Sequence, residues 1–218
     1  MEPKFWHERW AAEQIGFHQR ETNSHLENYW QTSGLESGSR ILVPLCGKSL
    51  DMLWLVRQGH KVVGIEISPL AVEAFFTENG LSPSVTSGPG YTCWSDAGID
   101  LYCGDFFSLD IGVTGNVDGF FDRAALVAMP PSKRPAYVTQ LTSLLPAQAS
   151  GLLVTMDYNQ REMDGPPFAV PASEVYSLFA GDYLVEQLHE ADVLESNPAF
   201  RDKGLGRLKE HVFRLTRN

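Results

Sequence analysis

The stretch that most constrains the fold runs from residue 40 to residue 69, RILVPLCGKSLDMLWLVRQGHKVVGIEISP. Its pattern predicts a strand at 41–43, a loop, a helix from Leu50 to Val56 and a second strand at 61–67. Two strands joined by a crossover helix form a βαβ unit, in which the strands are parallel and adjacent. We therefore expect an α/β fold built on a parallel sheet.

Glu66 stands at the end of the second predicted strand, the edge where parallel sheets bind ligands. A carboxylate about 20 residues after the first loop can accept both hydroxyl groups of a ribose. The alternative is a solvated strand end without a ligand, because short motifs of this kind often occur by chance. The position favours a nucleoside site, with Glu66 as its best single residue.

The loop after the first strand is poor in glycine. Gly47 is its single glycine, and Leu45 and Cys46 stand where a pyrophosphate needs close backbone approach. The run Cys46-Gly47-Lys48-Ser49 supplies only the last three residues of a P-loop. The loop therefore suits a nucleoside without phosphates, and S-adenosylmethionine is such a nucleoside.

The composition is that of a soluble globular protein. The 218 residues suffice for one sizeable core, with 43% hydrophobic and 20% charged residues. A net charge of −10 argues against nucleic acid or an anionic membrane surface as partner. We see neither a signal-peptide pattern nor an apolar span of about twenty residues, and expect a cytoplasmic protein. The three cysteines lack the spacing of a disulfide framework or a zinc site.

Residues 1–33 precede the predicted sheet and carry three tryptophans. Trp6 and Trp10 are four residues apart, on one face of a predicted helix, and Phe17 lies in the loop that follows. Core packing explains Trp30. For Trp10 and Phe17 two interpretations stay open: a helix pair packed on the sheet edge, or a lid whose aromatic faces cover a purine and exclude water.

Asp105 and Phe106 follow the third predicted core strand, 99–103. The acid lies one strand over from Glu66, so it could bind the amine of an adenine while the ring covers the adenine face. The alternative is an ordinary turn containing an aspartate.

Asp122 and Arg123 follow the fourth predicted strand, 116–121, which lies beside the first strand in the usual doubly wound order. A guanidinium there faces the cleft and binds carboxylates bidentately. It suits the methionine carboxylate of the cofactor or an anionic substrate. The alternative is a surface ion pair between Asp122 and Arg123, which contributes little energy.

The C-terminal part predicts an antiparallel hairpin at the sheet edge, because no helix is expected between the strands 183–188 and 210–215. The polar connection between them, residues 192–206, contains Arg201. The Pro- and Gly-rich loop 159–171 fits a wall on the substrate side.

Several motifs resemble the thiopurine S-methyltransferase family. They are Pro44-Leu45-Cys46-Gly47-Lys48, Val63–Ser68, Phe17-His18, Asp122–Ala128 and Gly165–Phe168. The likeness covers nearly the whole chain in the right order, and the start of the chain resembles the bacterial members. It implies methyl transfer from S-adenosylmethionine to sulfur of aromatic and heterocyclic thiols such as thiopurines. The bacterial members are also associated with selenium and tellurium compounds and with tellurite resistance.

The resemblance implies a class I S-adenosylmethionine-dependent methyltransferase, Rossmann-like, with a seven-stranded, mostly parallel sheet and an antiparallel edge hairpin. We expect a single domain, with residues 1–33 as an N-terminal helical lid and residues 34–218 as the core. We also expect a monomer that acts on a small-molecule thiol. Two alternatives are an NAD-type oxidoreductase, disfavoured by the missing G-x-G-x-x-G, and a non-catalytic nucleoside-binding protein.

Matching positions assign the binding residues. The residues implied to contact the cofactor are Trp10, Leu45 (through its backbone), Glu66, Asp105, Phe106 and Arg123. Those implied to face the substrate are Phe17, Arg123 and Arg201. The resemblance implies no metal, and we name no catalytic base. Vertebrate relatives tend to have serine at the position of Asp105, so the role of that side chain stays open.

Overall fold

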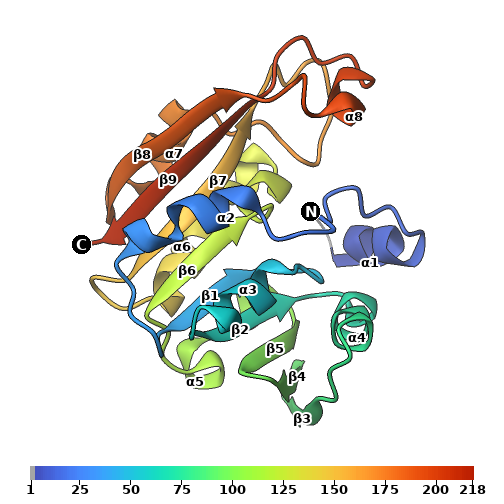
Figure 1. Ribbon diagram of the computed structural model, residues 1–218, viewed down its shortest axis with the longest axis vertical. Helices are drawn as coiled ribbons and strands as arrows, with labels where there is room; N and C mark the ends of the chain where they lie inside the picture. The colour runs from blue at the N-terminus through green and yellow to red at the C-terminus, as the bar shows by residue number, and fades with distance from the viewer. Residues whose placement is uncertain (1–2) are drawn as a thin grey trace.

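The computed structural model describes residues 3–218, and its strands form one nine-stranded sheet in the order β3-β4-β5-β2-β1-β6-β7-β9-β8. Figure 1 shows α2 and α3 in front of this sheet and α6 and α7 behind it. The strands are β1 Arg40–Pro44, β2 Lys61–Glu66, β3 Ser84–Gly88, β4 Tyr91–Asp96, β5 Ile99–Gly104, β6 Gly119–Arg123, β7 Ser150–Asp157, β8 Tyr183–Asp192 and β9 Lys209–Arg217. The α-helices are α1 Pro3–Ala11, α2 Ser24–Tyr29, α3 Asp51–Arg57, α4 Pro69–Glu78, α5 Ile111–Thr114, α6 Arg134–Leu144, α7 Ala172–Phe179 and α8 Pro198–Arg201.

The central strands are parallel, as predicted. Strand β1 pairs in parallel with β2 and β6, β2 pairs in parallel with β5, and β6 pairs in parallel with β7. Strand β9 is antiparallel to both β7 and β8. The mostly parallel sheet and its antiparallel edge hairpin are therefore confirmed.

Strand β1 shows why these segments become central strands. Ile41 and Val43 belong to one buried apolar cluster, and Leu42 between them belongs to the other. Successive side chains of a strand point to opposite faces, so a continuous apolar run fits a strand that is covered on both faces.

Two strand assignments differ from the sequence prediction. A hairpin of β3 and β4 extends the sheet beyond β5, and the sequence did not predict β3. The first four residues of β3 are exposed, so no buried alternation marks this strand. The fourth parallel strand begins at Gly119 and includes Arg123. Asp118 lies before it and accepts the backbone N–H of Arg40 at 2.7 Å through its side chain.

The N-terminal segment has two differently anchored parts. After α2, Trp30 is 1% exposed, and its indole N–H donates to Nε2 of His60 at 2.9 Å, which ties this part to the core. Helix α1 buries only Trp10. In Figure 1, α1 and α8 lie on the side toward which β1, β2 and β6 point. Both elements therefore border the carboxyl ends of the parallel strands, where ligands of such sheets bind.

Candidate active site

A cavity of about 950 Å³ opens at the carboxyl ends of the parallel strands. Its walls come from the ends of β1, β2, β5, β6 and β7, from the segment around α1 and from the loop around α8. Ligand pockets of proteins span roughly 300–1,000 Å³, so this one is large enough for a nucleoside with a second small molecule beside it.

Glu66 lies in this cavity and also organises the loop after β1. It is 6% exposed, and its carboxylate accepts the backbone N–H groups of Gly47 at 2.9 Å and Ser68 at 2.7 Å, one on each oxygen. Burial raises the pKa of Glu66, and these backbone donors oppose the rise. Each carboxylate oxygen keeps a second lone pair, so the group can still accept two ribose hydroxyls.

The loop after β1 holds two residues in the left-handed region. Leu45 has φ 47° and Gly47 has φ 54°. For Leu45 this conformation costs roughly 1–2 kcal/mol, and the adjacent Cys46 N–H bond to the Ile65 carbonyl at 3.0 Å helps to hold it. A Cβ on Gly47 would lie 3.1 Å from the Trp10 ring. Glycine therefore lets the indole of α1 pack directly on this loop.

An aromatic cluster covers the loop. The Phe17 ring meets those of Trp6 and Trp10 edge to face, at centroid distances of 5.8 and 5.6 Å. The Phe17 carbonyl accepts a hydrogen bond from Nη2 of Arg123 at 3.0 Å. Residues far apart in the sequence are thus joined over the cavity.

Arg123 is a half-buried cation in the cavity wall. Burial lowers its pKa, and the carboxylates of Asp51 and Glu210 act in the opposite direction. Asp51 already accepts hydrogen bonds from the Asn23 N–H at 2.7 Å and the Ser49 hydroxyl at 2.8 Å. Within residues 3–218, Arg123 forms no ion pair, so its remaining donors can serve a ligand.

The interpretation of Asp122 and Arg123 as a surface ion pair is wrong. Asp122 is fully buried and accepts the Tyr137 hydroxyl at 2.7 Å and the Leu126 N–H at 3.1 Å. Burial raises the pKa of Asp122 to about 6. Neighbouring side chains of a strand point to opposite faces, so Asp122 faces α6 while Arg123 faces the cavity.

Asp105 and Phe106 also line the cavity, after β5. The Asp105 carboxylate accepts the Phe107 N–H at 3.0 Å, which makes it the N-cap of the following turn. Phe106 is 4% exposed and stacks on Tyr137 at 5.2 Å. Phe107, which sequence reasoning did not single out, lines the cavity with 41% of its surface exposed. It offers a ligand more ring surface than Phe106.

The opposite end of the cavity, which we call the acceptor end, is largely apolar. It is lined by Val154, Met156, Pro166, Pro167, Asn197, Ala199, Phe200, Lys203 and Glu210. Arg201 is not brought to this wall: its side chain is 53% exposed and lies 3.5 Å from Glu195. Lys203, two residues later, lines the cavity with its ammonium 5.3 Å from the centre of the Phe200 ring.

Arg134 connects the segments that form the walls of the acceptor end. It is 1% exposed, and its Nη1 binds both carboxylate oxygens of Glu174 at 2.6 Å. Its other nitrogens donate to the carbonyls of Met129 at 3.1 Å and Ala169 at 2.9 Å. One buried guanidinium thus connects α6, α7 and the loop that carries Pro166 and Pro167.

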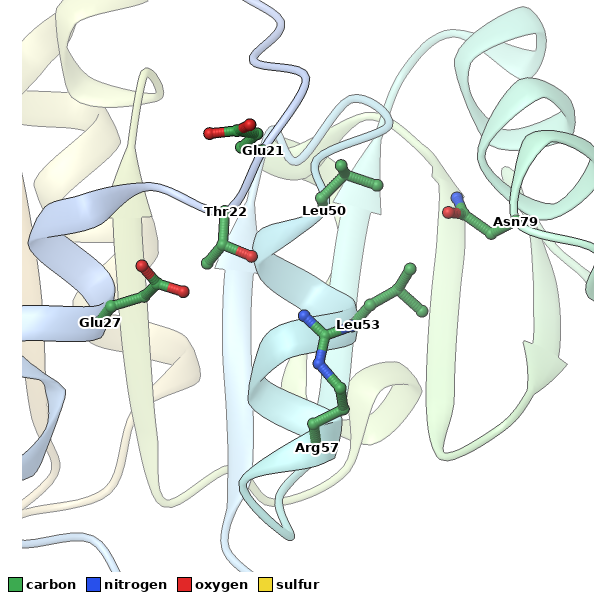
Figure 2. Close-up of a pocket in the computed structure, with 7 residues that line it drawn as sticks. All are labelled: Glu21, Thr22, Glu27, Leu50, Leu53, Arg57 and Asn79. Carbon is green, nitrogen blue, oxygen red and sulfur yellow. The ribbon is translucent and has the colours of Figure 1, made fainter.

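A second hollow, of about 460 Å³, lies along the outer side of α3. Figure 2 shows Leu50, Leu53 and Arg57 from this helix, with Glu21, Thr22, Glu27 and Asn79 around them. Arg57 forms no ion pair with any residue of the described chain, and the polar groups do not converge. This hollow is therefore not the candidate site.

Neither a metal-ligand cluster nor a membrane-spanning helix is found in residues 3–218. No group of three or more His, Cys, Asp or Glu side chains there could hold a metal ion. No helix of that part is long and apolar enough to cross a membrane. The three cysteines are free thiols.

The sheet order, the carboxylate at the end of β2 and the phosphate-free loop after β1 define a class I S-adenosylmethionine-dependent methyltransferase. The model of the family "Thiopurine S-methyltransferase (TPMT)" matches residues 1–218. The chain belongs to this family.

Individual proteins agree with that assignment. The chain is 48% identical over 217 residues to a thiopurine S-methyltransferase of Pseudomonas entomophila (strain L48), with 100% of each chain covered. It is 49% identical over 215 residues to one of Nitrosospira multiformis, covering 99% of this chain and 98% of the relative. The crystal structure of an S-adenosylmethionine-dependent methyltransferase from Anabaena variabilis superposes with a TM-score of 0.67 at 14% identity, over 99% of this chain and 95% of that one.

Proposed function

We propose that this protein transfers the methyl group of S-adenosylmethionine to the sulfur of aromatic and heterocyclic thiols, thiopurines among them. One observation carries the proposal: a single cavity combines the carboxylate of Glu66, held by two backbone N–H groups, with an apolar acceptor end and the cation of Arg123, which forms no ion pair within residues 3–218. When bound, the cofactor supplies an electrophilic methyl group on a sulfonium sulfur.

The cofactor end fits a nucleoside without phosphates. We assign Glu66 to the ribose hydroxyls, because it is buried and keeps spare lone pairs. The Leu45 backbone and the Trp10 ring form the floor and cover beside it, and Gly47 leaves room for that ring. The turn of Asp105 and Phe106 is assigned to the adenine.

The acceptor end suits an anionic sulfur. Heterocyclic thiols are acidic enough to be partly ionised near neutral pH, and the thiolate is the nucleophile. Arg123, without an ion pair in the described chain, favours that anion in a desolvated site and also holds Phe17 over it. Arg201 can reach this end once its exposed pair with Glu195 opens, and such a pair is worth only about 0–1 kcal/mol.

The protein's remaining contribution to the reaction is to position the reactants and to exclude water. An in-line displacement needs the acceptor sulfur aligned with the methyl group and water excluded, and it needs no base when the thiol is already ionised. We propose that residues 1–33 act as the lid that excludes water over a core of residues 34–218. We further propose a cytoplasmic monomer whose partner is a small molecule.

Incubation with radiolabelled S-adenosylmethionine and a thiol panel tests the proposal, with selenium and tellurium acceptors added because the family resemblance implies them. We expect label in S-methyl products of aryl and heterocyclic thiols. Calorimetry with S-adenosylmethionine and with NAD addresses the oxidoreductase alternative. Binding of NAD but not S-adenosylmethionine would overturn the proposal, and so would cofactor binding without transfer to any thiol.

A further inference from the structure

Four carboxylates line the cavity, and one of them differs from the rest. Asp51, Glu66 and Asp105 each have both oxygens in hydrogen bonds within the protein. Oε2 of Glu210 lies 2.8 Å from Nε2 of His25. Its other oxygen, Oε1, has no hydrogen-bond donor in the described part of the chain. Of the four, Glu210 is therefore the carboxylate with one oxygen that accepts no hydrogen bond within residues 3–218.

The sheet register places Glu210 on the same face as Arg123. Arg123 pairs with Val154 across β6 and β7, and Met156, two residues further along β7, pairs with Glu210 across β7 and β9. Side chains two residues apart share a face, and paired residues do too. Val154 and Met156 both line the cavity. A cation and an anion thus flank an apolar stretch of the acceptor end.

His25 holds Glu210 in this position. The imidazole belongs to α2, and its side chain is 12% exposed, against 25% for Glu210. The other ring neighbours of His25 are Tyr29 and His189, at centroid distances of 6.2 and 5.4 Å. Arg123 and Lys203 are among the cations that line the same cavity. A carboxylate held by one oxygen presents the other in a fixed direction, which suits recognition of a donor.

We propose that Glu210 accepts a hydrogen bond from a ring N–H of the methyl acceptor, and that it selects heterocyclic thiols with such a donor over thiols without one. The inference rests on the proposed function and deepens it. A thiol without an N–H group leaves the Glu210 oxygen desolvated and unpaired, whereas a purine-like ring satisfies it. The acceptor sulfur then lies toward Arg123. His25 is a positioning residue, because it acts only through Glu210.

The test compares two acceptors that differ in one N–H group, such as a thiopurine and its ring N-methylated analogue. For the wild-type enzyme we expect kcat/KM to favour the N–H acceptor by about 10- to 100-fold. Glu210→Leu, whose side chain has no acceptor atom, should bring this ratio close to one, mostly by slowing the N–H acceptor. His25→Phe should lower the same ratio, which a purely structural role would not change.

Glu190→Leu is the matched control, because Glu190 sits on the neighbouring strand and pairs with Lys209 outside the cavity. Calorimetry of both acceptors with S-adenosylhomocysteine present gives a readout apart from turnover, and the two affinities should converge in Glu210→Leu. Equal loss on both acceptors, or an unchanged ratio, overturns the inference. A wild-type enzyme that methylates neither acceptor contradicts the proposed function instead.

Discussion

The two ends of the cavity are built in different ways. At the cofactor end, Glu66 follows a central strand and binds the backbone of the loops on both sides. At the acceptor end, the walls come from loops and short helices, and a few side chains such as Arg134 and His25 hold them. The cofactor end is therefore fixed by the sheet itself, and the acceptor end depends on side-chain ties. Substrate range can change at one end without disturbing the other.

The largest effect on stability is expected when Arg134, which holds the acceptor end, is replaced. Arg134→Met removes one partner of a buried ion pair and leaves two carbonyls unpaired, so the free energy of unfolding should fall by about 3–5 kcal/mol. Chemical denaturation measures it. At a temperature where the variant is folded, the KM for the thiol should rise while affinity for S-adenosylhomocysteine is kept.

Arg214→Met is the control, because Arg214 pairs with the exposed Glu186 and binds one carbonyl, that of Thr32, so its loss should cost only about 1–2 kcal/mol. Equal losses in the two variants would show that Arg134 has no special role in the acceptor end.

The second effect is a pH dependence of stability that comes from Asp122, the buried residue next to Arg123. Its pKa is raised from 3.8 to about 6 in the folded protein, so the folded state binds the proton more tightly. The stabilisation from this proton is complete below about pH 4 and is lost as the pH rises through about 6, by about 3 kcal/mol in total. Asp122→Asn should therefore gain that amount relative to wild type between pH 4 and pH 8. Parallel stability curves for the two proteins would contradict the burial argument.

The third effect belongs to the cofactor end. Glu66→Gln keeps the size of the side chain but loses charge-assisted bonding to ribose, so cofactor binding should weaken by about 1.5–3 kcal/mol. The thiol KM at saturating cofactor should change little. Unchanged affinity for S-adenosylmethionine would remove Glu66 from the site.

The smallest effect on stability is expected in α1. Trp10→Ala should lower the global free energy of unfolding by only about 0–1 kcal/mol, because a terminal helix with one buried residue opens without unfolding the core. If the segment is a lid, cofactor should protect residues 5–20 of the wild-type protein from proteolysis and quench tryptophan fluorescence. Identical digestion patterns with and without cofactor would show that this segment only packs against the core.

The same contrast explains what could be predicted from sequence. The β1–α3–β2 unit and Glu66 follow from local apolar patterns, and so does the edge hairpin. The strand β3 was missed, because its exposed polar residues carry no such pattern. Alternation along β9 could have placed Glu210 on the face of Val212, but its free oxygen depends on His25, 185 residues away.

The orientation of Arg201 could not be predicted, since the backbone path through α8 and the turn after it decides which cation faces the cavity. The structure turns Lys203 inward and leaves Arg201 beside Glu195. Likewise, the capping role of the Asp105 side chain depends on the backbone turn that follows it.

Calorimetric titration of S-adenosylhomocysteine into wild type, Glu66→Gln and Glu210→Gln tests most directly whether one cavity holds two separable ends. The account predicts at least about a tenfold loss of affinity for Glu66→Gln and wild-type affinity for Glu210→Gln. Equal weakening in both variants, or wild-type binding by Glu66→Gln, would contradict it.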